Sequence, residues 1–255
     1  MLHNTKGIVL RVTKYGDTSI ITSVYTELFG LQQYIVKGVR TSSKKGATKS
    51  VFYQPAAILE LEAYHSPLKA MQILKDANWS YVYQEVYANV VRNAVATYIV
   101  EILQQILQPE PHPELFYLIE DTLKQLDKGG PVLVSNLPIY FLIHLSETLG
   151  FGLQGMYSLE TPFLDVKEGQ FVSDKPLHPY FLEGVEAQTA SNFMTLQFYN
   201  NLETIELNGV HRKKILELFQ LSLSWHYKKF NEIKSLPILQ AVLHYYVYGS
   251  TSPRI

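Results

Sequence analysis

The chain has 255 residues, of which 47% are hydrophobic and 18% charged, with a formal net charge of −1 and no cysteine. That length provides for one large domain or two of modest size, with ample apolar side chains for a core. The lack of cysteine excludes disulfides, thiolate zinc sites, iron–sulfur clusters and cysteine nucleophiles. No signal-peptide pattern and no apolar run of about 20 residues is found, so we expect a cytoplasmic protein without a membrane segment.

The charge is distributed unevenly along the chain. Residues 1–79 hold ten Lys/Arg and five acidic residues, a net of +5, whereas residues 80–255 hold 12 and 18, a net of −6. This asymmetry favours two domains, the first of which faces an anionic polymer; an ordinary fluctuation in composition is the alternative. We therefore predict one domain of residues 1–79 and a second of residues 80–255.

The first 79 residues have the pattern of short strands, with β-branched and aromatic residues alternating between turn signals. We expect strands at residues 8–13, 20–26, 31–37, 57–64 and 68–74. In the first strand, alternation places Ile8, Leu10 and Val12 on one face, and Val9 and Arg11 on the other. Five strands in about 70 residues are typical of a small, partly open barrel such as the OB-fold, with a small sandwich as the alternative.

From Tyr81 onward the apolar period becomes helical. Two adjacent apolar rows, Val82 to Ile106 and Tyr83 to Leu107, predict one long helix that Pro109 and the prolines after it terminate. Further helices are expected at residues 113–127, 136–149, 184–200, 209–230 and 236–247. Residues 150–179 interrupt them with an expected hairpin at residues 163–166 and 170–172. The fold class is thus α+β: a five-stranded barrel, then a mainly α-helical domain with a small β-hairpin insertion.

No arrangement of residues points to catalysis. The chain has no Gly-rich phosphate loop, nucleophile elbow or His-Glu-x-x-His spacing. Its eight histidines are scattered, and no two are three or four residues apart. We expect a protein that is not an enzyme, with no catalytic residue, no cofactor and no bound metal.

The segment from Lys37 to Ser50 is the most informative part of the sequence. It has five cations, two glycines and several hydroxyl groups but no acid. Lys, Arg, Ser and Thr contact phosphate oxygens, and aromatic side chains stack on bases. The candidate DNA contacts are Arg11, Lys14, Lys37, Arg40, Lys44, Lys45, Lys49 and Tyr34. A merely solvated basic connection is the alternative, and the segment lies away from the face that OB-folds most often use.

A second basic cluster, His211 to Lys214, follows the expected helix cap at Asn208. Cations in the first turn of a helix oppose its dipole, each at a cost of roughly a few tenths of a kcal/mol. Together with exposed amide groups they would form an anion site. We expect Arg212, Lys213 and Lys214 to bind an acidic partner, unless Glu203 and Glu206 simply neutralise them.

A set of short motifs runs through the first 62 residues. They are Gly7-Ile8-Val9-Leu10, Tyr15-Gly16-Asp17, Thr26, Gly30, Lys37-Gly38, Arg40, Gln54-Pro55 and Leu59-Glu60-Leu61-Glu62. In this order they resemble the N-terminal domain of the bacterial RecO family, recombination mediators of DNA repair. Leu145 to Gly150, Asn208 to Phe230 and Ser235-Leu236 are similar to the family's helical domain.

The resemblance implies an N-terminal OB-fold, a helical second domain and a function in DNA repair. Members of the family bind single- and double-stranded DNA and anneal complementary strands. They partner RecR, contact the acidic tail of single-strand-binding protein and help to load RecA. By position, the resemblance makes Arg11, Lys37, Arg40, Lys44 and Lys45 the best candidates for DNA contacts.

The sequence departs from the family in one segment. Many members have a four-cysteine zinc module after the segment that ends here at Leu149-Gly150. This chain has Leu153, Gln154, Met156 and Tyr157 in that neighbourhood, so we expect no zinc there. The function we expect is a non-enzymatic DNA repair and recombination mediator. The alternatives are a single-strand RNA-binding OB protein and a protein-interaction adaptor.

Overall fold

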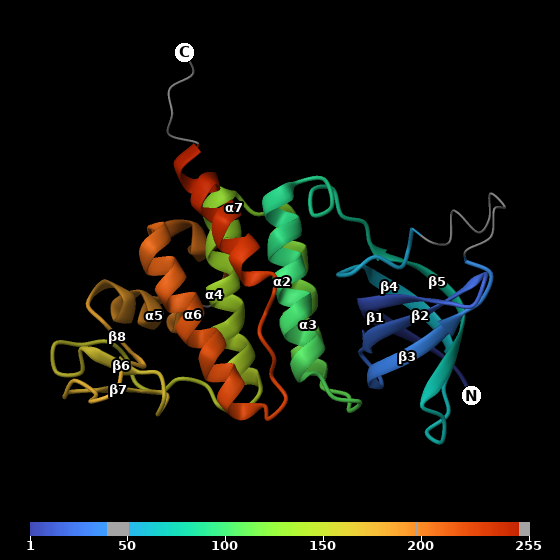
Figure 1. The fold of residues 1–255 in the computed structure, drawn as a ribbon, viewed down its shortest axis with the longest axis horizontal. Coiled ribbons are helices and arrows are strands. Elements are labelled where there is room, and N and C mark those ends of the chain that lie inside the picture. Colours follow the sequence, from blue (N-terminus) through green and yellow to red (C-terminus); the bar gives the residue numbers. More distant parts are fainter. Residues whose placement is uncertain (40–50, 197, 250–255) are drawn as a thin grey trace, which may run out of the picture. The chain divides into compact units, whose positions relative to one another are not determined.

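A computed structural model describes residues 1–39, 51–196 and 198–249, without the side chains of residues 244–249 (Figure 1). The chain forms two compact units. The first comprises Met1–Gln84 and Ile99–Lys124, and the second Glu85–Tyr98 and Gln125–Ile255. Strands give way to helices after Tyr81, close to the expected boundary at residue 79, but the first unit also takes in part of the helical segment.

Five strands of the first unit form a closed barrel (Figure 1). They are β1 (Leu2–Tyr15), β2 (Ser19–Thr26), β3 (Gly30–Val36), β4 (Ile58–Tyr64) and β5 (Met71–Tyr81). Their order is β1-β2-β3-β5-β4, with β1 paired to both β2 and β4, and only the β3–β5 pair is parallel. This topology confirms the expected OB-fold.

The last barrel strand begins later than expected, at Met71 rather than residue 68. Gln72 closes the preceding loop, because its side chain accepts a hydrogen bond from Ser66 N at 2.9 Å and donates to Ser66 O and Lys69 O. The apolar Leu68 is 97% exposed in this loop. The apolar pattern alone did not distinguish this loop residue from a strand residue.

The predicted faces of the first strand are wrong after Val9. The β1–β2 register shifts between Val9 and Arg11, so Leu10 is the extra residue of a β-bulge. Val9 therefore lies in the barrel core with Val12 packed against it. Ile8 and Leu10 are also buried, since helices of the same unit cover this part of the barrel: Gln104 Nε2 donates to Leu10 O at 2.7 Å.

The β2–β3 turn requires glycine at position 30. Gly30 has a φ of +62°, and a Cβ there would lie 2.1 Å from Glu110 O. Thr26 Oγ1 donates to Gly30 O and accepts from Phe29 N, which fixes the turn. The motif residues Thr26 and Gly30 thus have a structural explanation.

Helices α2 (Val90–Ile106) and α3 (Pro113–Lys128) contribute residues to both units. The sequence predicted a helix from residue 82, but α2 begins eight residues later. Asn89 caps it by accepting from Val91 N and Arg92 N. Asp127 holds the preceding segment in a turn by accepting from Glu85 N and Val86 N.

The second unit is built around α4 (Pro131–Thr148), which is buried on almost all sides. It is contacted by α5 (Val185–Thr195), the 3₁₀ helix η1 (Tyr199–Thr204), α6 (Gly209–His226) and α7 (Leu236–Gly249). The helix expected at residues 184–200 is therefore two elements. The helix expected from residue 136 begins at Pro131, a residue type favoured at the first helical position.

The insertion at residues 150–179 holds the expected hairpin, β6 (Phe163–Asp165) and β7 (Gln170–Val172). A third strand that the sequence did not predict, β8 (Phe181–Glu183), pairs with β6 on its other side. Over the described residues, none of the helices is both long enough and apolar enough to cross a membrane.

Candidate nucleic-acid interface

One end of the barrel brings two of the predicted cations together. Lys14 pairs with Ile20 across β1 and β2, and Ile20 pairs with Val36, the last residue of β3. Lys37 is the next residue, so Lys14 and Lys37 lie at the same end of three adjacent strands. Both side chains are exposed.

Arg11 belongs to a polar row on the outside of the same strands. It pairs with Ser23, which pairs with Gln33 on β3. Arg11 and Gln33 are exposed and Ser23 is partly exposed. A guanidinium, a hydroxyl and an amide thus cross three strands in a row parallel to that of Lys14, Ile20 and Val36, an arrangement suited to sugar and phosphate contacts.

These cations are available to an external anion. Within the described ranges, Arg11, Lys14 and Lys37 form no ion pair with an acidic side chain. Arg40, Lys44, Lys45 and Lys49 lie outside the described residues. We call the exposed residues Arg11, Lys14, Tyr15 and Lys37 the barrel surface.

Tyr34 was wrongly predicted to contact DNA. Its side chain is 0% exposed and belongs to the barrel core with Val24 and Leu59. Burial raises the pKa of its hydroxyl to about 12. Alternation along β3 identified two faces but could not tell which one the barrel encloses.

Tyr15 is the aromatic residue that this surface does expose. Its side chain is 48% exposed at the β1–β2 turn, next to Lys14. The turn sequence Gly16-Asp17 that follows it was the available signal, because side chains at the tip of a turn point into solvent.

The cations of the predicted acidic-partner site do not act together. Arg212 is only 4% exposed and is a structural residue. Its Nη2 donates to Leu207 O at 2.7 Å and to Asn136 Oδ1 at 3.2 Å. Asn136 in turn donates to Leu202 O and Ile205 O, so this buried network joins α4, η1 and α6.

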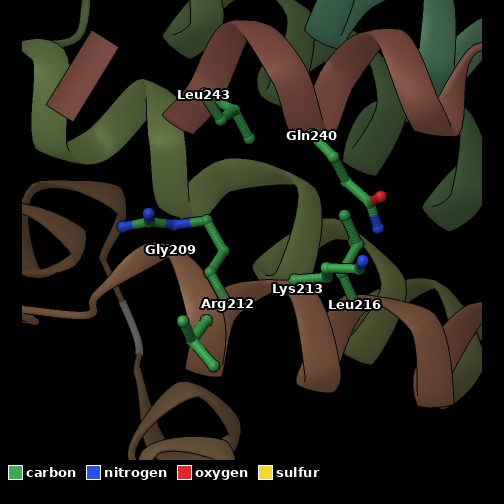
Figure 2. Close-up of a pocket in the computed structure, with 7 residues that line it drawn as sticks. Gly209, Arg212, Lys213, Leu216, Gln240 and Leu243 are labelled. Atoms are coloured by element: carbon green, nitrogen blue, oxygen red, sulfur yellow. The ribbon is translucent and has the colours of Figure 1, made fainter. Parts of the chain in front are cut away.

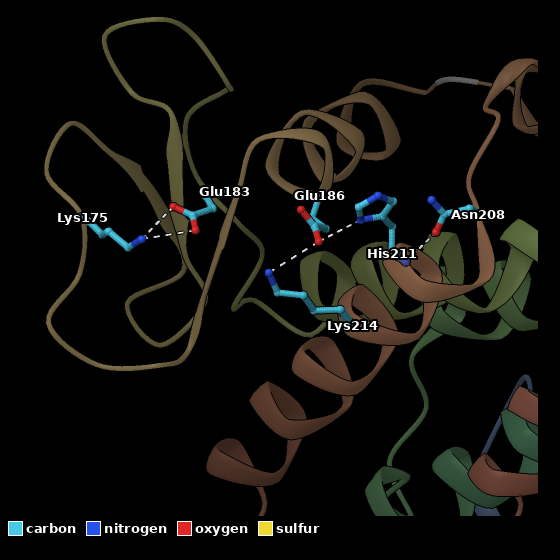
Figure 3. A network of polar contacts seen from close by, with 6 residues as sticks. All are labelled: Lys175, Glu183, Glu186, Asn208, His211 and Lys214. Atoms are coloured by element: carbon cyan, nitrogen blue, oxygen red, sulfur yellow. Dashed lines mark hydrogen bonds and ion pairs between the residues drawn. The ribbon is translucent and has the colours of Figure 1, made fainter.

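Two neighbours of Arg212 are paired with an acid that the sequence had not indicated. His211 Nδ1 lies 2.9 Å from Glu186 Oε1, and Lys214 Nζ lies 3.5 Å from the same oxygen (Figure 3). Burial raises the pKa of Glu186, but the bond from His211 and the charge of Lys214 outweigh it, so the pKa lies below its ordinary value. Glu203, the neutralising acid proposed from sequence, instead accepts from Gly130 N at the start of α4.

Lys213 is exposed, with its Nζ 3.8 Å from Glu217 Oε1, and lies beside a mainly apolar pocket of about 440 Å³ between α6 and α7. Figure 2 shows Gln240 and Leu243 of α7 facing Lys213 and Leu216 of α6 across this pocket. An apolar floor with a cation at its rim suits an acidic peptide that carries an apolar side chain.

The different environments of Arg212 and Lys213 predict a large effect on stability at Arg212 and a small one at Lys213. Arg212→Met leaves Asn136 Oδ1 and Leu207 O without this donor in a buried site, and we expect the free energy of unfolding to fall by about 3 kcal/mol. Lys213→Met, the matched control one residue away, should change it by less than about 0.5 kcal/mol. Urea unfolding monitored by circular dichroism measures the free energy of unfolding of both variants. Equal losses would contradict the assignment of Arg212 as a structural residue.

Comparison with known proteins identifies the family. The profile described as "Recombination protein O N terminal" matches residues 1–83, and "Recombination protein O C terminal" matches residues 88–165. A DNA repair protein RecO of Phocaeicola vulgatus is 30% identical over 241 residues, covering 94% of this chain and 98% of that protein. Those of Christiangramia forsetii and Bacteroides fragilis are 29% and 30% identical over 95% and 94% of this chain. The chain belongs to the RecO family.

The RecO zinc module does not fit this chain. No cysteine is present, and among the described residues no group of three or more His, Asp or Glu side chains could hold a metal ion. In the insertion, Asp165 Oδ1 accepts from Lys167 N and Glu168 N, and its Oδ2 lies 3.2 Å from His178 Nε2. Hydrogen bonds thus connect the loops of this small RecO sheet.

Proposed function

We propose that this protein binds single- and double-stranded DNA through its barrel, anneals complementary strands and assists recombinase loading onto DNA coated with single-strand-binding protein. The observation that carries the proposal is the barrel surface, which places Lys14, Tyr15 and Lys37 at one end of an OB-fold, with the exposed Arg11 farther along the same strand as Lys14. Arg40, Lys44, Lys45 and Lys49 belong to the same basic segment of the sequence and lie outside the described residues; they extend this proposal. Membership of a DNA repair family supports it.

The mechanism follows from phosphate neutralisation. Lys and Arg side chains that neutralise phosphates displace the counterions condensed on the DNA. Because every nucleotide carries the same phosphate, this binding does not depend on the base sequence. A flexible strand held in this way keeps its base edges free to pair with a second strand. The chemistry requires no bond making or breaking by the protein, which fits a mediator rather than an enzyme.

The most direct test is strand annealing on DNA coated with single-strand-binding protein. The protein should accelerate annealing of complementary coated strands, and the acceleration should fall as salt is raised. No acceleration would contradict the function. Competition between DNA and RNA strands of the same sequence tests the RNA-binding alternative, and absence of binding to either would favour an adaptor.

The protein partners proposed are RecR, single-strand-binding protein through its acidic tail and, indirectly, RecA. For the acidic tail, the pocket between α6 and α7 supports a site with Lys213 at its edge, and Lys214, the next residue of α6, pairs with Glu186. Arg212 also lines this pocket, but it is only 4% exposed and its Nη2 donates to Leu207 O, so its main contribution to the site is to hold α6 in place.

Glu186 should compete with an acidic tail for Lys214 and His211. Removing its charge in Glu186→Gln is therefore expected to strengthen binding of a labelled acidic peptide with an apolar end by about 3-fold, since a partly exposed ion pair is worth up to about 1 kcal/mol. Lys213→Glu should weaken the same binding. Fluorescence anisotropy measures both, with Lys167→Glu as an exposed control; unchanged affinity in both variants would refute this site.

A further inference from the structure

The connection from α6 to α7 combines aromatic and basic side chains. The run Trp225-His226-Tyr227-Lys228-Lys229-Phe230, which leads from the last turn of α6 into this connection, contains no acid, and the first acid after it is Glu232. Trp225, in the last turn of α6, is 41% exposed, and Lys228 and Lys229 are exposed. In the described part of the chain, neither lysine forms an ion pair.

A second exposed ring lies against Trp225. The centroids of Trp225 and Tyr180 are 5.3 Å apart with the ring planes at 71°, and Tyr180 is 38% exposed. The backbone at Tyr180 is fixed, because its N–H donates to His178 Nδ1 while His178 Nε2 bonds Asp165. The edge-to-face contact leaves part of each ring open to solvent.

The neighbouring rings hold the start of this connection in place. Phe151 stacks on His226 with centroids 4.0 Å apart and an interplanar angle of 14°, and it meets Tyr227 edge-on at 6.3 Å. Burial raises the pKa of Tyr227. The exposed side chains of Trp225, Lys228 and Lys229 are therefore next to two residues, His226 and Tyr227, that Phe151 holds in place.

Exposed aromatic faces beside unpaired lysines match the chemistry of a single nucleic-acid strand. Bases stack on the rings whatever their sequence, and the lysines meet the phosphates. We propose that Tyr180, Trp225, Lys228 and Lys229 form a second contact surface for single-stranded DNA, which we call the helical surface. It belongs to the second compact unit, whereas the barrel surface belongs to the first.

The helical surface deepens the proposed function on which it rests. Annealing brings two strands to one protein, and a second surface allows one chain to hold both. Loss of the helical surface therefore reduces annealing more than it reduces binding of one strand, because the barrel surface still binds.

Tryptophan fluorescence provides a direct test, because the chain has two tryptophans. In Trp79→Phe, which replaces the barrel tryptophan that packs on Phe52, Trp225 is the only one left. Titration with oligothymidylate should quench its emission in a saturable way as a base stacks on the ring. Emission that stays unchanged at saturating oligonucleotide would overturn the proposal. That result is also the one expected if this surface binds a protein rather than DNA.

Annealing provides the functional test. Trp225→Leu combined with Lys228→Glu and Lys229→Glu should slow annealing about 10-fold, from the loss of stacking and phosphate contacts. Trp225→Phe with both lysines retained is the matched control and should anneal nearly as the parent does. Circular dichroism and thermal unfolding verify that each variant is folded.

The outcomes separate this inference from the proposed function. A parent protein that does not anneal DNA refutes the proposed function itself. A parent that anneals, together with a folded triple variant that anneals equally well, refutes only the helical surface. If the triple variant cannot be purified folded, Trp225 quenching in Trp79→Phe still decides.

Discussion

Reversing the charge of Arg11, Lys14 and Lys37 to Glu is expected to weaken binding of single-stranded DNA about 100-fold at 0.1 M salt. The reason is the loss of three phosphate contacts, each of which contributes about 0.7 to the slope of log affinity against log salt for a single strand. The slope should therefore fall by about 2. Fluorescence anisotropy with a labelled oligonucleotide over a salt series measures both quantities.

The matched control carries the same charge change at three exposed lysines outside the barrel surface, Lys69, Lys167 and Lys213. Both variants have the same net charge, so a general electrostatic effect would weaken binding equally. If the two variants bind alike, the barrel surface is not the DNA contact. Lys44→Glu, Lys45→Glu and Lys49→Glu together test the rest of the basic segment by the same assay.

Removing both cations from a buried carboxylate of the first unit should have the largest effect on stability. Glu120 on α3 is 2% exposed and lies 3.1 Å from Lys6 Nζ and 2.9 Å from Lys124 Nζ. Lys6→Met with Lys124→Met leaves the carboxylate buried and unpaired, and should lower the free energy of unfolding by about 3–5 kcal/mol. Adding Glu120→Leu should recover much of the loss, because no unpaired charge remains.

The same carboxylate predicts a pH dependence. Burial acts to raise the pKa of Glu120, but its hydrogen bonds and ion pairs with Lys124 and Lys6 prevail, so the folded-state pKa lies below its ordinary value of 4.5. Its contribution to stability is then present above 4.5 and is lost as the pH falls through the folded-state value. Urea unfolding from pH 7 to 3 should show the difference between the parent and Glu120→Gln shrinking below pH 4.5; a constant difference would contradict it.

Helix ends show how far local sequence decides the fold. The prolines at 109, 111 and 113 end one helix and begin the next, and Asn208 caps α6 by accepting from His211 N. The start of α2 was missed because Val82 and Val86 continue its apolar row, although a buried Asp127 holds that segment in a turn. A contact between residues about 40 positions apart leaves no trace in a local pattern.

In the candidate sites, too, the sequence decided some features and the tertiary structure decided others. The exposed cations Arg11, Lys14 and Lys37 were found from composition, because charged side chains rarely lie inside a core without partners. Tyr34 and Arg212 were misplaced, and Tyr15 was not chosen, because each decision depended on which strand face or helix face is enclosed. The aromatic and basic residues at the end of α6 are visible in the sequence. Their assignment as a nucleic-acid contact required the tertiary structure, which shows that Trp225 and Tyr180 are exposed.

The sequence by itself determined the family, the order of strands and helices, and the concentration of positive charge in the first 79 residues, since these follow from residue types and their spacing. The tertiary structure decided which side chains reach solvent. Burial depends on what packs against a residue, as with Tyr34 inside the closed barrel and Arg212 beneath η1 and α4. It also depends on pairing between distant residues, as with Glu186 at Lys214 and Glu120 at Lys6, because such contacts arise only when separate elements fold together.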